Sequence, residues 1–250
     1  MVNQIKKTGD TMRLSPHIPS RPWRDLKYAL WLPLYLLLFL ALERMPTGRY
    51  WATQLPVDAR IPFCEWFIIP YCLWYPFLVL TGLYLLRRDR AAFRRYMLFL
   101  GITFFASELI WFVLPNGQDL RPAAFSRENL LTALAAGLYR IDTNTNVFPS
   151  VHVLGSVGAA LAVRDCRCSE GKPLLRAGAA LLAAAICLST VFIKQHSVLD
   201  VVGGLLLGGL TARLVYRSSP AFRPSREEAP RKAPAHRRHG QKLLRRIRES

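Results

Sequence analysis

The sequence contains few acidic residues and few cysteines. Its 250 residues include 16 Asp and Glu against 34 Lys and Arg, a formal net charge of +18, and only five cysteines. Cysteines so few and so scattered exclude a disulfide framework. Cys166 and Cys168 are close together, but no second Cys or His pair accompanies them, which excludes a zinc site. We therefore expect unpaired thiols.

The excess of positive charge occurs in a chain that is 52% hydrophobic. Several apolar runs reach about 20 residues, the length that a helix needs to cross roughly 30 Å of hydrocarbon. A nucleic-acid-binding protein shares the basic charge but not these runs, so we expect a membrane protein without a nucleic-acid partner. The first run is longer than the apolar part of a signal peptide and lacks a cleavage site, which predicts a retained span.

The apolar runs predict an all-α fold, a bundle of six transmembrane helices. The expected spans lie at about 28–43, 62–86, 97–114, 148–163, 174–193 and 198–216. The fourth is short for a spanning segment and needs polar residues or tilt to complete it. Residues 127–139 show helical periodicity but begin with charge, so we expect a short interfacial helix in the outer loop between spans three and four.

The basic residues are distributed unequally between the two sides of this bundle. The terminal segments and the two loops on their side hold 26 of the 34. By the positive-inside rule that side is the cytoplasm, so we expect the cytoplasmic membrane, with both termini inside. The expected domains are a basic segment 1–27, a six-span phosphatase-like membrane domain 28–216 and a basic disordered tail 217–250. We expect the tail to bind anionic lipids, each basic residue contributing about 1 kcal/mol of binding free energy near the membrane surface. The alternative is that the basic tail has no role. The oligomeric state stays open.

Three polar patches interrupt the apolar pattern, at residues 116–122, 146–152 and 189–200. The charge distribution places all three on the outer side, although they were not used to assign the topology. They can therefore form one site on the outer face.

The third patch contains a histidine and a carboxylate with helical spacing. His196 and Asp200 are four residues apart at the start of a predicted helix, so both point to one face. A carboxylate in that position holds the imidazole in one tautomer and stabilises its cation. The pair can serve as a base with its orienting group.

The other groups of these patches favour an anion. Ser150 and His152 follow Pro149 at the start of a predicted helix, where free backbone N–H groups and the helix dipole attract negative charge. Arg121 offers a planar fork for phosphate, and Lys194 adds a compact positive charge. Two histidines, two cations and one carboxylate suit phosphoryl transfer through a phosphohistidine.

The spacing resembles the type 2 phosphatidic acid phosphatase superfamily. Its signature is K-x6-R-P, then P-S-G-H, then S-R-x5-H-x3-D, and the three motifs occur here in that order over spans three to six. The matching positions are Arg121 and Pro122, then Pro149, Ser150 and His152, then Ser189, His196 and Asp200.

The resemblance implies a role for each matching residue and no metal or other cofactor. His196 is the expected nucleophile, Asp200 orients it, and His152 protonates the leaving oxygen. The expected phosphate-binding residues are Arg121, Ser150, Ser189 and, by position, Lys194. Fixed cations and helix-end amides meet the charge on the phosphate oxygens.

Three positions depart from the family pattern. Leu114 replaces the lysine of the first motif, Val151 the glycine of the second and Thr190 the arginine of the third. Two expected cations are therefore missing, and we hypothesise that Lys194 supplies one of them. The third motif also resembles the branch that includes inositol phosphorylceramide synthases, which transfer a phosphate-bearing headgroup between lipids.

Other polar residues near these motifs are assigned structural roles. Glu65 and Glu108 lie within predicted spans, and we expect them to pair with Arg60, Arg121 or a tyrosine hydroxyl. Asn116, Gln118 and Asp119 either orient Arg121 or cap the loop.

The expected function is hydrolysis of a lipid phosphate or diphosphate in the membrane. Candidate substrates implied by the family are phosphatidic acid, phosphatidylglycerol phosphate and polyprenyl diphosphates. A transferase with an alcohol acceptor is one alternative, because the same histidines serve both reactions. A non-catalytic lipid-binding membrane protein is the second, because two cations are missing.

Overall fold

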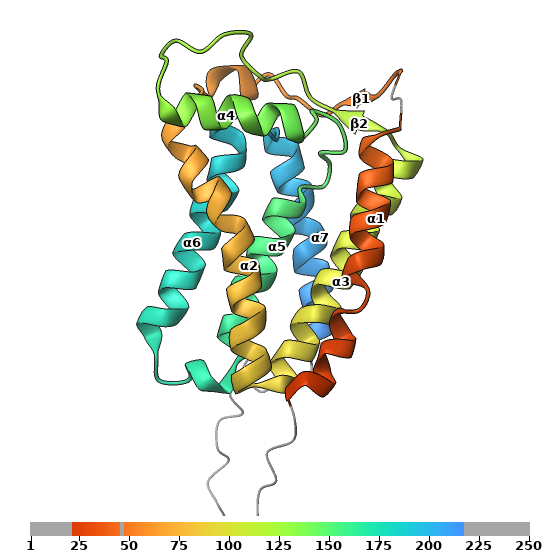
Figure 1. The fold of residues 1–250 in the computed structure, drawn as a ribbon, viewed down its shortest axis with the longest axis vertical. Coiled ribbons are helices and arrows are strands. Elements are labelled where there is room, and N and C mark those ends of the chain that lie inside the picture. The colour runs from red at the N-terminus through yellow and green to blue at the C-terminus, as the bar shows by residue number, and fades with distance from the viewer. Residues whose placement is uncertain (1–21, 46–47, 218–250) are drawn as a thin grey trace, which may run out of the picture.

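The apolar runs form long helices that stand side by side in one bundle (Figure 1). The computed structural model describes residues 22–45 and 48–217. The long helices are α1 (Leu32–Glu43), α2 (Ile68–Arg88), α3 (Arg90–Val113), α4 (Leu130–Ile141), α5 (Val151–Asp165), α6 (Pro173–Phe192) and α7 (Val198–Tyr216). Short 3-10 helices are η1 (Pro22–Ala29), η2 (Asp58–Arg60), η3 (Glu65–Phe67) and η4 (Arg167–Ser169). Strands β1 (Trp51–Ala52) and β2 (Asn116–Gly117) pair in parallel.

Five helical segments are long and apolar enough to cross a membrane, which indicates an integral membrane protein. They are Arg24–Glu43, which joins η1 to α1, then Glu65–Arg88, Arg90–Val113, Pro173–Phe192 and Val198–Tyr216. The all-α prediction is confirmed, and five of the six predicted spans meet this criterion. The predicted fourth span corresponds to α5, which has 15 residues and therefore a length of about 22 Å.

Helix α5 is a short helix in the core of the bundle. It packs against α2, α3, α6 and α7, and eleven of its fifteen residues are buried. Its glycines permit this contact, since a Cβ on Gly158 would lie 2.7 Å from the ring of Phe99. The surrounding helices instead carry exposed leucines, such as Leu181 on α6 and Leu206 on α7, which suit contact with lipid.

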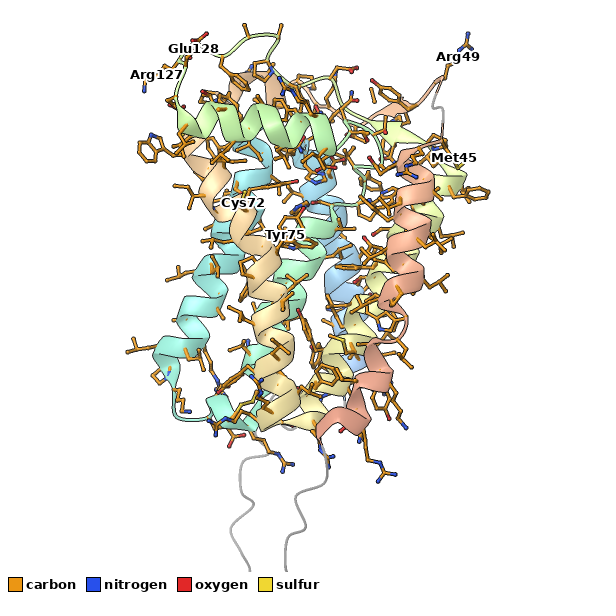
Figure 2. All side chains as sticks on the ribbon, viewed as in Figure 1. Met45, Arg49, Cys72, Tyr75, Arg127 and Glu128 are labelled. Atoms are coloured by element: carbon orange, nitrogen blue, oxygen red, sulfur yellow. A yellow bond between two sulfur atoms is a disulfide. The ribbon has the colours of Figure 1, made fainter. Side chains whose placement is uncertain are left out.

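Helix α4 lies across one end of the bundle, close to β1 and β2 (Figure 1). Figure 2 shows Arg127 and Glu128 at the same end, just before α4 begins. The predicted helix at 127–139 is found at Leu130–Ile141. It begins later because Asn129 forms a capping box with Thr132 and fixes the first turn there. The start of η1 and the end of α7 lie at the opposite end.

Ion pairs and a disulfide hold the opposite end. Arg94 of α3 donates to Asp25 of η1 at 2.7 Å, and Arg95 donates to Asp165 of α5 at 2.7 Å. The expectation of unpaired thiols was wrong for Cys166 and Cys168, which form a disulfide. The turn between α5 and η4 brings their Cα atoms to 5.2 Å, within the range for a disulfide.

The remaining three cysteines, Cys64, Cys72 and Cys187, are free, as expected. Most of the predicted basic segment 1–27 and nearly all of the predicted tail 217–250 lie outside the described residues.

Neither of the two acids predicted within spans forms one of the expected pairs. Glu65 accepts a hydrogen bond from Asn129 at 3.4 Å and pairs with Arg127 at 3.8 Å, so it anchors the loop before α4. Glu108 is 4% exposed, and neither of its carboxylate oxygens has a hydrogen-bond partner among the described residues.

We predict that Gly204 is required for the contact between α5 and α7. A Cβ there would lie 2.9 Å from Val153 Cβ and 3.1 Å from the carbonyl oxygen of Ser150. Gly204→Ala is therefore expected to destabilise the protein by about 1–3 kcal/mol. Gly209→Ala, on the same helix, meets nothing within 4 Å and serves as the control. Thermal unfolding in detergent measures both, and equal melting temperatures would contradict the prediction.

Candidate active site

A cavity of about 180 Å³ lies at the end of the bundle that carries α4. Its walls come from α1, α2, α3, α5, the loop after α4 and the segment before α7. Both histidines of the sequence motifs line it. The lining residues used below are Tyr35, Glu43, Trp74, Asp142, His152 and His196. We call this cavity the histidine pocket.

The structure brings His152 and His196 together although they are 44 positions apart in the chain. Their ring centroids are 5.7 Å apart, and the side chains are 5% and 6% exposed. The backbone N–H of Ser150 donates to the carbonyl of Asp200 at 3.1 Å, which joins the starts of α5 and α7. His196 Nδ1 lies 3.6 Å from Asp200 Oδ2, within ion-pair distance, but no hydrogen bond joins them.

The ring of His152 is held by stacking. Tyr71 stacks on it with a centroid distance of 4.3 Å, and Trp74 lies at 4.5 Å. Neither ring nitrogen has a hydrogen-bond partner among the described residues. A buried imidazole with both nitrogens unpaired is unusual in a folded protein and is available for a ligand in the pocket.

The start of α5 adds backbone donors to the same wall. Val151 and His152 occupy the first turn, where N–H groups have no partner within the helix. Ser150 caps the helix and accepts from Val153 N at 3.4 Å, so its hydroxyl serves the helix. The pocket therefore has the positive end of a helix dipole beside its histidines.

Side chains of the first polar patch form hydrogen bonds with the backbone of the other two patches. Asn116 Oδ1 accepts from the backbone of Val147 and Phe148 at 2.9 and 2.7 Å. Gln118 Nε2 donates to the carbonyls of Lys194 and Gln195 at 2.9 and 3.3 Å. Both side chains also cap their own loop, as one of the two expectations had it, because Asn116 Nδ2 donates to the carbonyl of Leu114 and Gln118 Oε1 accepts from Leu120 N. Each in addition fixes a segment that carries a histidine.

Arg121 lies beside the pocket but does not line it. Its guanidinium donates to the carbonyls of Tyr139, Asp142 and Thr143, and to Gln195 Oε1. Its carbon Cζ lies 4.6 Å from the ring centroid of Tyr139. Burial lowers the pKa of this guanidinium, and its Nε has no hydrogen-bond partner among the described residues. Arg121 thus closes the loop after α4 against the segment before α7.

The geometry of Lys194 argues against its expected role as a replacement phosphate cation. Lys194 has a backbone φ of 57°, and its Nζ donates to the carbonyls of Asp58 and Ile61. Its side chain therefore turns toward η2 and is absent from the wall of the pocket. Ser189 does not line the pocket either. Its hydroxyl donates to the carbonyl of Ile186 within α6.

Asp142 is an acidic residue of the site that the sequence motifs did not predict. Asp142 Oδ2 accepts from the Tyr71 hydroxyl at 3.1 Å and from Gln195 Nε2 at 3.0 Å. Asp142 is therefore linked to the stacked ring of His152 and to the neighbour of His196. Burial raises the pKa of the Asp142 carboxyl. The signal available in the sequence was the position of Asp142 in the loop before the second patch. Nothing in the spacing of the motifs distinguishes Asp142 from an acid without a role in the site.

Glu43 at the end of α1 is the second acid that was missed. It accepts from the Thr143 hydroxyl at 2.6 Å and from Asn146 Nδ2 at 2.8 Å. These partners are 100 and 103 residues away in the chain, and Asn146 has a φ of 57°. Glu43 thus fixes the loop that leads into α5.

We predict that Lys194 acts on stability. Lys194→Ala leaves the Ile61 carbonyl without its donor and the Asp58 carbonyl with only the backbone N–H of Ile61, so it is expected to cost about 1–3 kcal/mol of unfolding free energy. Lys172→Ala, at an exposed position, is the matched control and is expected to change it by less than about 0.5 kcal/mol. Thermal unfolding measures the difference. A Lys194→Ala protein of normal stability with weaker substrate binding would restore the phosphate role.

We predict a pH-dependent stability difference for Asp142→Asn. The folded protein binds the Asp142 proton more tightly than the unfolded chain, because the pKa is raised on folding. The carboxyl group therefore loses its stabilising contribution as the pH rises through the folded pKa, whereas asparagine does not titrate. The melting temperature of the variant relative to wild type should therefore rise as the pH increases above the ordinary pKa of an aspartate, about 4. A difference that is constant or falls with pH would contradict this.

Comparison with known proteins gives one match. Residues 112–224 match the sequence profile of the PAP2 superfamily, whose members are generally phosphatases and related hydrolases. Neither the curated proteins nor the solved structures gave a match. The matched segment contains all three polar patches and both pocket histidines. This segment of the chain is therefore similar to the PAP2 superfamily, which is consistent with the resemblance of its motifs to the type 2 phosphatidic acid phosphatases.

Proposed function

We propose that the protein is a membrane-embedded phosphatase that hydrolyses a lipid phosphate or diphosphate through a phosphohistidine. The observation that carries this proposal is the histidine pair. His152 and His196 face one pocket with a ring separation of 5.7 Å, and Asp200 lies 3.6 Å behind His196. This is the arrangement of a nucleophile, its orienting acid and a proton donor.

The two histidines have separate tasks in the proposed reaction. Because His196 Nδ1 faces Asp200, Nε2 is the nitrogen that attacks phosphorus, and the N–P bond forms as the P–O bond to the leaving alcohol breaks. His152 gives the leaving oxygen a proton. Water then attacks the phosphohistidine, the N–P bond breaks, and His152 takes the proton from the water. Asp200 stabilises the imidazolium of His196.

The phosphate oxygens have donors at the start of α5. The amides of Val151 and His152 and the positive end of the helix dipole face the pocket that holds the histidines. Ser150 contributes by capping this helix. Arg121 lies beside the pocket, and its proposed contact with phosphate requires it to exchange Gln195 or a loop carbonyl for a phosphate oxygen. Ser189 and Lys194 support the backbone around the site.

An apolar cavity next to the histidine pocket supports a lipid substrate. It has a volume of about 440 Å³, lies among η1, α1, α2 and α3, and is lined almost entirely by apolar atoms. Tyr35, Leu36, Trp74 and Tyr75 line both this cavity and the histidine pocket. Figure 2 shows Tyr75 on α2 below the level of α4. A lipid tail in the apolar cavity would place its phosphate at the histidines.

The proposal includes a topology. The end with α4 and the histidine pocket faces outward, α4 lies in the interface, and α5 is the sixth span, shielded from lipid by its neighbours. Both termini are cytoplasmic, in the cytoplasmic membrane, and the basic tail contacts anionic lipids. The end of α2 and the start of α3 lie on the proposed cytoplasmic side, in accord with the positive-inside rule, and carry Arg87, Arg88, Arg90, Arg94 and Arg95.

A lipid headgroup transferase is the second candidate. Thr143, Thr145 and Asn146 line the histidine pocket and offer neutral hydrogen-bonding groups to an alcohol. An alcohol bound there would attack the same phosphohistidine in place of water.

We predict that His196→Ala abolishes turnover of labelled lipid phosphates by purified protein. His152→Ala should lower the rate by about 10²–10⁴-fold, as expected for loss of a general acid. The same substitution at His239, in the C-terminal basic segment, is the control and should leave the rate unchanged. Acid-labile label on the protein should appear in wild type and be absent in His196→Ala. Free phosphate identifies a phosphatase, and a new lipid formed with added alcohol identifies a transferase. Equal activity of wild type and His196→Ala across a lipid panel would leave a non-catalytic lipid-binding protein.

A further inference from the structure

The two pocket histidines differ in what surrounds their ring nitrogens. His196 has the carboxylate of Asp200 within ion-pair distance of its Nδ1, at 3.6 Å. His152 is 5% exposed, and neither of its ring nitrogens has a hydrogen-bond partner among the described residues. A hydrogen bond to one nitrogen commonly orients a functional imidazole. Since the described residues supply none for His152, a different kind of contact must fix its ring.

Aromatic rings of α2 supply that contact. The ring of Tyr71 stacks on the imidazole of His152 with a centroid distance of 4.3 Å and an interplanar angle of 26°. The ring of Trp74 lies at 4.5 Å and is tilted by 39°. Tyr71 and Trp74 are three residues apart in one helix, so both project from the same face of α2. Two rings on one helix thus restrict the orientation of the imidazole.

Both rings are held in place by contacts of their own. Tyr71 is fully buried and donates its hydroxyl to Asp142 Oδ2 at 3.1 Å. The indole of Trp74 lies against Gly155, one turn after His152 on α5, where a Cβ would be 2.7 Å from Trp74 Nε1. The absence of a side chain at Gly155 therefore provides the space for the indole beside His152. The imidazole is fixed through α2 and through the loop that carries Asp142.

We propose that Tyr71 and Trp74 are positioning residues, which hold the His152 imidazole by aromatic contact and leave both of its nitrogens free for proton transfer. This inference rests on the proposed function, in which His152 gives a proton to the leaving oxygen, and it adds the residues that aim that proton. Because a misplacement of about 1 Å can cost about 10²-fold in rate, loss of a stacked ring should impair the acid without removing it.

The test uses two esters that differ in how much their leaving oxygen needs a proton. Hexyl phosphate releases a strongly basic alkoxide, whereas p-nitrophenyl phosphate releases a stabilised phenolate that departs without a proton. The constant kcat/KM covers phosphoryl transfer to His196 and leaves out hydrolysis of the phosphohistidine, so it isolates the step in which His152 is the acid. His152→Ala is the benchmark, with an expected loss of about 10²-fold or more for hexyl phosphate and less than about tenfold for p-nitrophenyl phosphate.

Variants of two buried tyrosines separate positioning from packing. Tyr71→Leu removes the stacked ring and is expected to lower kcat/KM about tenfold or more with hexyl phosphate and less than about threefold with p-nitrophenyl phosphate. Tyr71→Phe keeps the ring and should restore nearly wild-type values for both esters. Tyr216→Leu is the matched control, because Tyr216 is 2% exposed, lies at the opposite end of the bundle and lines neither the histidine pocket nor the apolar cavity. It should leave the ratio of the two constants unchanged.

A second measurement tests the aromatic contact itself and needs no turnover. The chain has five histidines, so NMR of protein with labelled histidine can resolve their imidazole protons, and the signal lost in His152→Ala belongs to His152. Ring currents of Tyr71 and Trp74 should shift this signal upfield. The shift is expected to decrease in Tyr71→Leu and in Trp74→Leu and to persist in Tyr71→Phe.

The outcomes separate this inference from the proposed function. Equal losses with both esters in Tyr71→Leu, or a His152 signal that does not move in that variant, would overturn the positioning role while the phosphohistidine proposal stands. Equal losses with both esters in His152→Ala would overturn the acid role of His152 and the positioning role with it. Turnover that survives His196→Ala would overturn the proposed nucleophile, whereas a loss in Tyr71→Leu confined to hexyl phosphate would still sustain the positioning of His152.

Discussion

The contact between the starts of α5 and α7 is the constraint on which the site depends. The amide of Ser150 donates to the carbonyl of Asp200, and Gly204 lets Val153 approach α7 without an intervening side chain. This contact sets the separation of His152 and His196, because each histidine lies within four residues of the hydrogen bond. Asn116 and Gln118 then fix the two segments from outside the helices. The polar residues of the loops thus serve mainly to position two imidazoles.

The charge of the protein and the charge of its pocket have opposite signs. The chain as a whole carries +18, yet the pocket walls carry Glu43 and Asp142 and no lysine or arginine among the described residues. The two cations near the site, Arg121 and Lys194, donate to backbone carbonyls and so stabilise loops. Phosphate recognition without a lining cation then depends on helix-end amides and imidazoles.

The position of α5 explains how a polar pocket and a lipid-sized cavity can be neighbours. A helix surrounded by four others needs no long apolar run. The first turn of α5 can therefore lie within the bundle, where His152 lines the histidine pocket. The apolar cavity among η1, α1, α2 and α3 meets the pocket at shared aromatic residues, of which Trp74 also stacks on His152. The substrate tail and the reacting phosphate can therefore occupy adjoining spaces in one bundle.

The sequence by itself determined the helices, the order of the three polar patches and the pair formed by His196 and Asp200. These depend on local properties, namely runs of apolar residues and short spacings along the chain. Only the tertiary structure decided that Glu43 and Asp142 face the histidines, since their partners lie up to 103 residues away. It also decided that Lys194 lies against η2 and not in the pocket. Lys194 has a positive φ, and its Nζ donates to the carbonyl of Asp58. Spacing in the chain predicts which residues can share a helix face, whereas the packing of several helices determines which faces meet.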